Sequence, residues 1–404
     1  MQCLQIMLVG LDRLPSELRL IQSLRSAQVA LLAHPASVDR NVMHISRVLE
    51  ACGIRPVKIF GPEHGYGGEA QDMIGVEHAV DPITNAPIVS LYGGSIEALS
   101  PTAEDLQGLN VLLVDLCDVG SRYYTFVWTA LLAIRSALKQ GMRAVVLDRP
   151  NPIGGTFASV EGRSQRSGFL SFVGLEPIPV RHSLTLGEIV AEMCAREGVN
   201  VSPDGQVQIV GVQGWQREDL AHRWDRAFVM PSPNMPTPDT ALVYPGGCLL
   251  EGTNLSEGRG TTRPFEILGA PWLDGVRLAR DFATLGLAGC ALRPLTFLPT
   301  FHKHGGKVCG GVQVQVVDPV AFRPMAAYLG IIALAQKQCP EDFRFRTERY
   351  EFVDNIPAID LLVGGAEARE AMLAGASPRE VIATVCPVED SYGELFARAC
   401  ARVA

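Results

Sequence analysis

The sequence lacks any long run of like charge and any apolar stretch long enough to span a membrane. Its 404 residues carry a net charge of -8 at pH 7, and the isoelectric point is near 5.6. Because nucleic acids and anionic membranes attract clustered basic residues, this even distribution argues against both as partners. No segment approaches the roughly 20 apolar residues of a transmembrane helix. We therefore expect a small-molecule substrate, while the oligomeric state stays open.

Paired cysteines are missing as well. The ten cysteines are scattered singly, and no Cys-x-x-Cys motif indicates a zinc knuckle or a redox site. We expect reduced thiols, and neither a metal nor a cofactor. The N-terminus has no basic start and a short apolar run, and no small-residue cleavage site follows it. Together with the free thiols, this favours a cytoplasmic location.

The phosphate-binding loops of nucleotide enzymes are also absent. No Gly-x-Gly-x-x-Gly follows the first strand candidate, and no Gly-x-x-x-x-Gly-Lys-Ser/Thr occurs. What the first half does contain is a regular alternation of short apolar runs with helical patterns. The strand candidates are Val29–Ala33, Val57–Phe60, Ile88–Leu91, Val111–Val114 and Ala144–Leu147, and the helix candidates between them are Asn41–Cys52, Thr102–Leu109 and Phe126–Gln140. This alternation predicts an α/β fold, with a Rossmann-like, mostly parallel sheet covered by helices on both faces.

Polar side chains follow the ends of these strand candidates. They are His34, Glu63, His64, Asp115, Asp118, Asp148, Arg149 and Asn151. Ligands of open parallel sheets bind beyond the carboxyl ends of the strands, so we expect these residues to share one rim. The alternative for any single residue is a cap or turn role that serves the fold alone.

The second half has a different pattern. Leu184–Glu197 is a helix candidate and Val207–Val212 a strand candidate, after which four prolines in Pro231–Pro238 exclude a helix or a central strand. We place the domain boundary there, with a Rossmann-like catalytic domain at 1–235 and a smaller α+β domain at 236–404. The period-two run Val312–Val317 predicts a strand with one solvated face. Further helix candidates are Val320–Gln338, Ala366–Ala374 and Tyr392–Arg402.

The segment Phe60–Gly68 is the expected chemical centre. An apolar run ends at Gly61-Pro62, and Glu63 and His64 follow among glycines. Such a turn bends sharply and lets a ligand approach closely. A glutamate there would be partly desolvated, which raises a carboxyl pKa toward that of a general acid. The alternative is that Glu63 caps a helix or pairs with an arginine.

Several motifs resemble one known family in order and spacing. They are Gly61–Gly65, Ser90–Gly93, Asp115 with Asp118–Gly120, Arg122–Thr125, Asp148–Pro152, Pro231–Thr237, Glu251–Asn254 and Glu257–Gly260. The chain resembles, over nearly its whole length, the exo-β-N-acetylmuramidases of glycoside hydrolase family 171, formerly a bacterial domain of unknown function. The resemblance implies a Rossmann-like domain joined to a smaller one, with the active site in the cleft between them. It also implies release of N-acetylmuramic acid from the non-reducing end of peptidoglycan fragments, with Glu63 as the general acid.

The second catalytic group stays open among several carboxylates. Asp115 is the favoured choice, with Asp118 and Glu257 as alternatives and His64 beside the acid; the substrate's own acetamido group is a further possibility. An arginine is expected to bind the lactyl carboxylate, with Arg259 and Arg149 favoured over Arg122 and Arg181. Internal ion pairs with Asp148 or Glu257 are the alternative for these arginines. Sugar hydroxyls are expected to meet Asn151, Asn234 and Asn254, and a stacking face is expected from Tyr123 or Tyr124.

Two rival functions are kept. A metal-dependent hydrolase could use His34, Glu63, His64, Asp115 and Asp118, although no His-x-x-x-His spacing occurs. A non-catalytic muropeptide or sugar sensor could use the same cleft without turnover. Many members of the resembled family carry an export signal, so the expected cytoplasmic location favours salvage of imported muropeptide sugars.

Overall fold

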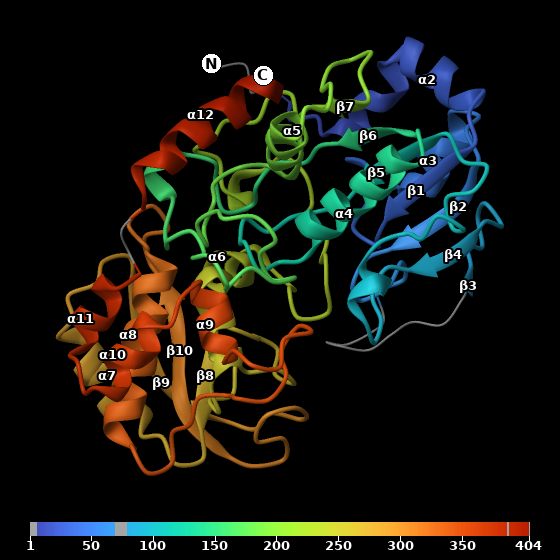
Figure 1. Cartoon of the computed structure of the whole chain (residues 1–404). Helices are drawn as coiled ribbons and strands as arrows, with labels where there is room; N and C mark the ends of the chain where they lie inside the picture. Colours follow the sequence, from blue (N-terminus) through green and yellow to red (C-terminus); the bar gives the residue numbers. More distant parts are fainter. Residues whose placement is uncertain (1–5, 69–78, 386–387, 404) are drawn as a thin grey trace.

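A computed structural model describes residues 6–68, 79–385 and 388–403. The first part of the chain forms a seven-stranded sheet in the order β3-β4-β2-β1-β5-β6-β7 (Figure 1). Its strands are β1 Val29–Ala33, β2 Pro56–Gly61, β3 Ala79–Val80, β4 Pro87–Ser90, β5 Val111–Asp115, β6 Arg143–Leu147 and β7 Val207–Val210. All neighbouring strands pair in parallel except β3, which runs antiparallel to β4. The parallel Rossmann-like sheet is therefore confirmed.

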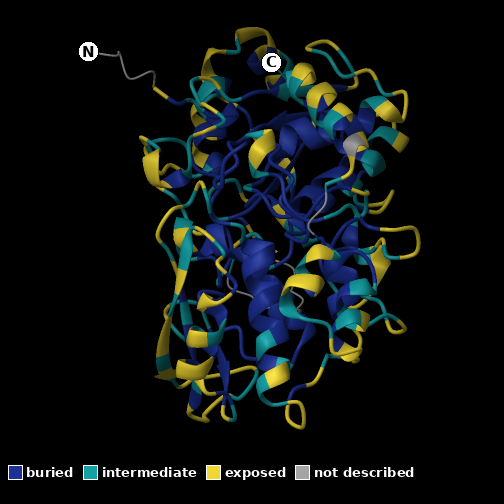
Figure 2. Ribbon diagram, turned by 90° about the vertical axis from the view of Figure 1, so that its left-hand side faces the viewer, coloured by how far each residue is buried: buried dark blue, intermediate teal, exposed yellow. Residues whose placement is uncertain are grey.

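Helices cover both faces of this sheet, as the near-continuous apolar strands predict. In β1, Ala30 and Leu32 face the core that contains α4, whereas Leu31 faces the core that contains α2 and α3. The helices of this unit are α1 Gly10–Arg13, α2 Leu18–Arg25, α3 Ile45–Ala51, α4 Phe126–Lys139 and α5 Leu186–Arg196, with short 3₁₀ turns at Leu14–Ser16, Ile96–Leu99, Phe157–Ser159 and Ala221–Arg223. Buried side chains are concentrated in the middle of the molecule and exposed ones at its periphery (Figure 2).

The second unit is smaller and contains a three-stranded antiparallel sheet in the order β8-β10-β9. Its strands are β8 Ile267–Ala270, β9 Cys290–Phe297 and β10 Cys309–Val316. Its helices are α6 Pro238–Gly247, the 3₁₀ helix η5 Cys248–Gly252, α7 Gly275–Ala283, α8 Pro324–Gln338, α9 Ala358–Val363, α10 Glu367–Leu373 and α11 Pro378–Ala383. The smaller α+β unit is confirmed.

The last helix, α12 (Asp390–Val403), returns to the first unit and packs on α5 (Figure 1). Arg398 and Arg402 each donate to the buried Glu192 of α5, at 2.8 and 2.7 Å. A second link between the units is Glu161, whose carboxylate accepts from the backbone N–H groups of Met325 and Ala326 at the start of α8. A carboxylate at a helix N-terminus satisfies donors that the helix cannot satisfy itself. These contacts hold the two units against each other.

One predicted helix is wrong. Residues 103–108 form turns instead of a helix. Asp105 accepts from the backbone N–H and the hydroxyl of Thr102, and Thr102 accepts in return from the Asp105 N–H. Such local side-chain bonds compete with helical ones, and Gly108 then turns the chain with φ +79°. The sequence reading also missed β8, β9, α6 and α7, and α6 begins at Pro238, where proline suits the first helical position.

Candidate active site

The turn after β2 has a geometry that requires its glycines. The N–H of Gly65 donates to the carbonyl of Pro62 at 2.9 Å, and His64 has φ +70°, as in a type II turn. A Cβ atom on Gly61 would lie 2.5 Å from the backbone nitrogen of Tyr66. The chain therefore folds tightly back on itself here and leaves Glu63 and His64 at the wall of a cavity.

Both units line that cavity. The first unit contributes Glu63, His64, Tyr123, Tyr124, Thr125, Phe126, Val173, Ser232, Asn234 and Met235. The second contributes Tyr244, Glu251, Arg259, Phe265, Tyr350 and Glu351. Neither unit forms the site alone.

Glu63 is buried at this wall, with 7% of its surface exposed. The hydroxyl of Thr125 donates to its Oε2 at 2.7 Å. Thr125 directly precedes α4, so the start of a buried helix fixes the orientation of the carboxyl group. A carboxyl group held in this way keeps one position relative to a ligand in the cavity.

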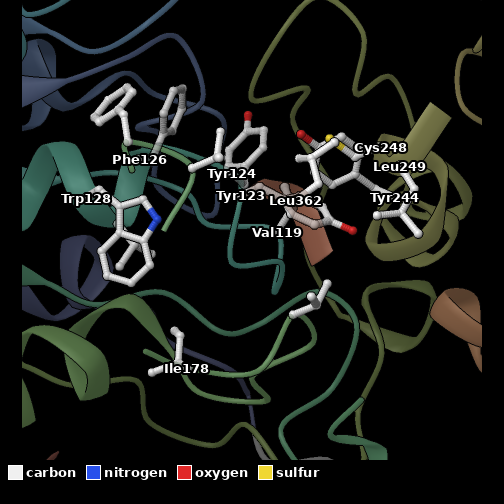
Figure 3. Packing of buried hydrophobic residues seen from close by; sticks show 14 of the residues in the cluster. Val119, Tyr123, Tyr124, Phe126, Trp128, Ile178, Tyr244, Cys248, Leu249 and Leu362 are labelled. Carbon is white, nitrogen blue, oxygen red and sulfur yellow. The ribbon is translucent and has the colours of Figure 1, made fainter. Parts of the chain in front are cut away.

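Aromatic rings from both units form a continuous wall next to Glu63. The rings of Tyr124 and Phe126 lie 4.8 Å apart, Tyr124 meets Tyr244 edge-on at 5.9 Å, and Tyr244 meets Phe265 edge-on at 4.9 Å. Figure 3 shows Tyr123, Tyr124 and Phe126 on one side and Tyr244 on the other. Burial raises the pKa of Tyr124 and Tyr244 well above the usual value, so both phenols stay neutral. The wall offers a sugar ring an apolar face and hydroxyl groups.

The second unit contributes two further carboxylates to the same cavity, Glu251 and Glu351, which were not among the predicted site residues. Glu251 accepts from Arg259 Nη2 at 2.7 Å and from the hydroxyl of Tyr350 at 2.7 Å. Glu351 accepts from the hydroxyl of Tyr92 at 3.3 Å. Glu251 belongs to the motif Glu251–Asn254 that carries part of the family resemblance, whereas none of those motifs contains Glu351.

Three non-glycine residues with positive φ values line the same cavity. His64, Phe265 and Glu351 all line it and have φ values of +70°, +63° and +43°. Non-glycine residues adopt such angles at a cost that the surrounding structure must offset, and they gather at functional sites. The strain supports a binding or catalytic role for this cavity.

Asp115, the favoured second carboxylate, lies elsewhere. It is fully buried, and both of its oxygens accept from Arg149, one of them at 2.8 Å from Nη2. Although burial opposes the charge on Arg149, Asp115 raises the pKa of that guanidinium. Neither residue lines the cavity of Glu63. The structure therefore shows an internal ion pair at this point of the rim.

Asp118 and His34 are also part of the supporting structure. Asp118 Oδ2 accepts from the backbone N–H of Gly120 at 2.8 Å and lies 3.2 Å from His182 Nε2. With Arg149, it lines a separate cavity of about 450 Å³. His34 Nε2 accepts from the backbone N–H of Cys117, and burial, with nearby Arg149, lowers the pKa of His34 to about 3.

Asp148 and Asn151 serve the loops around α5. Asp148 accepts from the hydroxyl of Thr185 and the backbone N–H of Gly187, both at 2.7 Å. Burial raises the pKa of Asp148 to about 7, and these two hydrogen bonds oppose the rise. Asn151 donates to the carbonyl of Leu184 at 3.0 Å. The structure places neither residue at the cavity of Glu63.

Arg122 and Tyr123 join the units instead of presenting free polar groups. The buried guanidinium of Arg122 donates to the carbonyls of Arg163, Ile178 and Leu362, and burial lowers its pKa to about 10. The ring of Tyr123 lines the cavity, but its hydroxyl donates to the carbonyl of Pro245. Arg181, the other arginine considered, is also buried and donates to the carbonyl of Ile153 at 2.6 Å.

The buried Glu257 is surrounded by three basic side chains, of which Arg259 is buried, Lys303 half-buried and His302 exposed. Its carboxylate lies 3.0 Å from Lys303 Nζ, 3.0 Å from His302 Nδ1 and 2.9 Å from Arg259 Nε. Although burial alone would raise the pKa of Glu257, Lys303, His302 and Arg259 hold it well below the usual value. The loop 302–304 thus contacts the site through Glu257. Asn254 lies outside the cavity, whereas Asn234 lines it.

The residues considered for a metal ion are dispersed. Among the residues that the structure describes, no three His, Cys, Asp or Glu side chains are placed to share an ion. In the same described ranges, no helix is long and apolar enough to cross a membrane.

Comparison with known proteins agrees with this architecture. A family model described as "Exo-beta-N-acetylmuramidase NamZ, N-terminal" matches residues 29–239, and the model of the corresponding C-terminal domain matches 242–400. The chain is 37% identical over 374 residues to the peptidoglycan beta-N-acetylmuramidase NamZ of Bacillus subtilis, covering 92% of this chain and 86% of that protein.

Two crystal structures of DUF1343 family proteins from Bacteroides fragilis share the fold. The first superimposes with a TM-score of 0.84 at 27% identity and covers 99% of both chains. The second has a TM-score of 0.71 at 23% identity and covers 98% of both, and it speaks for the fold alone. The family resemblance read from the motifs is thus confirmed, and the chain belongs to the exo-β-N-acetylmuramidase NamZ family of glycoside hydrolases.

Proposed function

We propose that this protein removes N-acetylmuramic acid from the non-reducing end of peptidoglycan fragments, with Glu63 as the general acid. One observation carries the proposal. The buried carboxyl group of Glu63 shares one cavity with two carboxylates, Glu251 and Glu351, that come from the other unit. Glycoside hydrolysis needs an acid at the leaving oxygen and a second group that stabilises or attacks the oxocarbenium-like carbon.

Glu63 suits the acid role because of its position. It sits on a tight turn at the end of a buried strand, and the Thr125 hydroxyl fixes the plane of its carboxyl group. Aromatic rings beside it exclude water from the reacting bond, which strengthens electrostatic interactions there. A fixed acid in a dry site can deliver its proton to the glycosidic oxygen without prior rearrangement.

We propose Glu351 as the second catalytic carboxylate. The alternative within the cavity, Glu251, is engaged by Arg259 and by Tyr350, both at 2.7 Å. Burial raises the pKa of Tyr350 well above its usual value, so Tyr350 stays a donor and Glu251 stays an acceptor. Glu251 therefore suits a positioning role. Glu351 lies buried at the cavity, accepts from the Tyr92 hydroxyl at 3.3 Å, and has a strained backbone with φ +43°.

The lactyl carboxylate of muramic acid calls for a cationic side chain in the cavity. Of the arginines considered from the sequence, Arg259 is the one among the described lining residues, and we propose that it binds the lactyl carboxylate. Its guanidinium lies 5.4 Å from the ring centre of Phe265, which fixes its plane. Asn234 and Ser232, on the facing wall, are proposed to bind sugar hydroxyls.

The test uses the disaccharide of N-acetylmuramic acid and N-acetylglucosamine. Proton NMR of the anomeric signals should show both free sugars, and the first anomer formed reports inversion or retention. Tight binding of the disaccharide without release of sugars would instead identify a sensor and refute the proposal. Activity lost on chelation and restored by a metal ion would refute it in favour of a metal-dependent hydrolase.

A further inference from the structure

A basic groove of about 750 Å³ lies beside the active-site cavity on the second unit. Its lining includes two arginines and a lysine, Arg344, Arg346 and Lys303, together with His302 and His304, and Glu348 is the one carboxylate among its described lining residues. The proposed chemistry does not use the basic side chains of this groove.

The wall that carries the arginines is a short two-stranded pairing. The N–H of Asn254 donates to the carbonyl of Arg344 at 3.0 Å, and the N–H of Arg346 donates to the carbonyl of Gly252 at 2.9 Å. Side chains two residues apart on an extended segment leave the same face, so Arg344 and Arg346 point to one side. The side chain of Asn254 also accepts from the Arg344 N–H and donates to the carbonyl of Asp342, which fixes the wall.

The loop between β9 and β10 forms the facing wall. His304 Nε2 lies 2.8 Å from the carbonyl oxygen of Asn254, and Lys303 donates to the carbonyl of Leu250 at 2.8 Å. His302 and His304 have φ values of +63° and +58°. The loop is thus held in a defined, strained conformation against the loop that carries Glu251.

The groove has an excess of positive charge. Within the described part of the chain, no carboxylate lies within 4.0 Å of the guanidinium of Arg344, and its Nη1 donates to the carbonyl of Phe343. Arg346 Nε lies 3.8 Å from Glu348, a largely exposed side chain, and this contact is too long for a hydrogen bond. Lys303 is neutralised by Glu257. A local positive patch on a chain of net charge -8 favours an anionic ligand.

Physical contacts connect the groove to the active-site cavity. The guanidinium of Arg346 lies 5.3 Å from the ring centre of Tyr350, and the hydroxyl of Tyr350 donates to Glu251 in the cavity. Glu257 likewise connects Lys303 of the groove to Arg259 of the cavity. In Figure 1 the β9–β10 loop and the segment between α8 and α9 extend from the same side of the second unit. The groove and the cavity therefore adjoin each other through these shared side chains.

We propose that this groove binds a carboxylate on the leaving-group side of the substrate, with Arg344 as its main contact and Arg346 as the second. The inference rests on the proposed function, because it assigns the part of a peptidoglycan strand beyond the scissile bond. There the first sugar is N-acetylglucosamine and the second is again a muramic acid with a lactyl carboxylate. A planar guanidinium binds a carboxylate through paired N–H donors.

The experiment compares the R344Q/R346Q double variant with the wild type on two substrates. One is a chromogenic N-acetylmuramic acid glycoside, whose leaving group has no carboxylate. The other is the tetrasaccharide of alternating N-acetylmuramic acid and N-acetylglucosamine, tested free, with the second lactyl group as its methyl ester, and with a peptide on the second muramic acid. R293Q is the matched control, since Arg293 is an exposed arginine on β9 that pairs with Gln313 outside the groove.

We expect the double variant to raise KM for the free tetrasaccharide about tenfold, with kcat and the chromogenic substrate unchanged. The wild-type KM for the tetrasaccharide should rise with salt, because the groove is open to solvent. Methylation of the lactyl carboxylate should abolish the difference between variant and wild type. A difference confined to the peptide-bearing substrate would overturn the lactyl assignment in favour of peptide carboxylates.

An equal change on both substrates, or none on either, would overturn the groove proposal while the catalytic proposal stands. Binding of the product N-acetylglucosaminyl-N-acetylmuramic acid, measured by calorimetry, needs no turnover. It should weaken about tenfold in the double variant and stay unchanged in R293Q. If the wild type shows this binding pattern but no turnover, the proposed reaction is refuted and the groove proposal is supported. The failure of one proposal can therefore be told from the failure of the other.

Discussion

The substitution Glu63→Gln tests the proposed acid most directly. The amide has nearly the same shape, and its oxygen can still accept the 2.7 Å hydrogen bond from Thr125. The folding cost should therefore stay below about 1 kcal/mol, the net value of one hydrogen bond. A general acid contributes about 10²- to 10⁴-fold to the rate, equal to about 3 to 5.5 kcal/mol of transition-state stabilisation. We expect kcat on the disaccharide to fall by that factor with KM little changed.

The leaving group provides the decisive assay. The leaving group of an acidic phenol glycoside needs little proton donation. Glu63→Gln should therefore keep most of the bond-cleavage rate on this glycoside and lose that rate on the disaccharide. Glu104→Gln, at an exposed glutamate on the turn segment 103–108, is the control and should match the wild type on both. Equal losses on the two substrates at unchanged melting temperature would refute the acid role. Full activity on the disaccharide would remove Glu63 from the mechanism.

Two further predictions separate catalytic groups from structural ones. Glu351→Gln should lower kcat at least about 10²-fold with little loss of stability. Asp115→Asn should instead cost about 3 to 5 kcal/mol of unfolding free energy, because it leaves Arg149 buried without its partner, and should retain kcat at low temperature. The opposite pattern would restore Asp115 as the second carboxylate. Glu257 has a folded-state pKa below its usual 4.5, so its stabilising effect is fully present above that pH and is lost as the pH falls through the folded-state value. Urea unfolding from pH 7 to pH 3 should thus show a shallower decline for Glu257→Gln than for the wild type, and parallel curves would contradict its pairing with the three basic side chains.

The local pattern of the chain was sufficient for most of the first unit. The run Val29–Ala33 is β1 to the residue, and Phe126–Gln140 agrees with α4 to within one residue. The hydrophobic patterns that predict this strand and this helix arise within short, continuous segments whose residues are buried together. The residues 103–108 failed because Thr102 and Asp105 bond to each other, a competition that hydrophobic periodicity does not register.

For the site, the sequence by itself determined the turn that bears Glu63. The glycines and the proline around this residue favour a tight turn through their backbone sterics alone. It also determined which residues stand at the strand ends. Only the tertiary structure decided which of them meet. Asp115 and Arg149 neutralise each other inside the first unit, whereas Glu351, nearly 290 residues away from Glu63 in the chain, closes the same cavity from the second. The physical reason is that the pairing and desolvation of charges depend on distances in space, and contacts between segments far apart in the chain leave no periodic pattern in either segment.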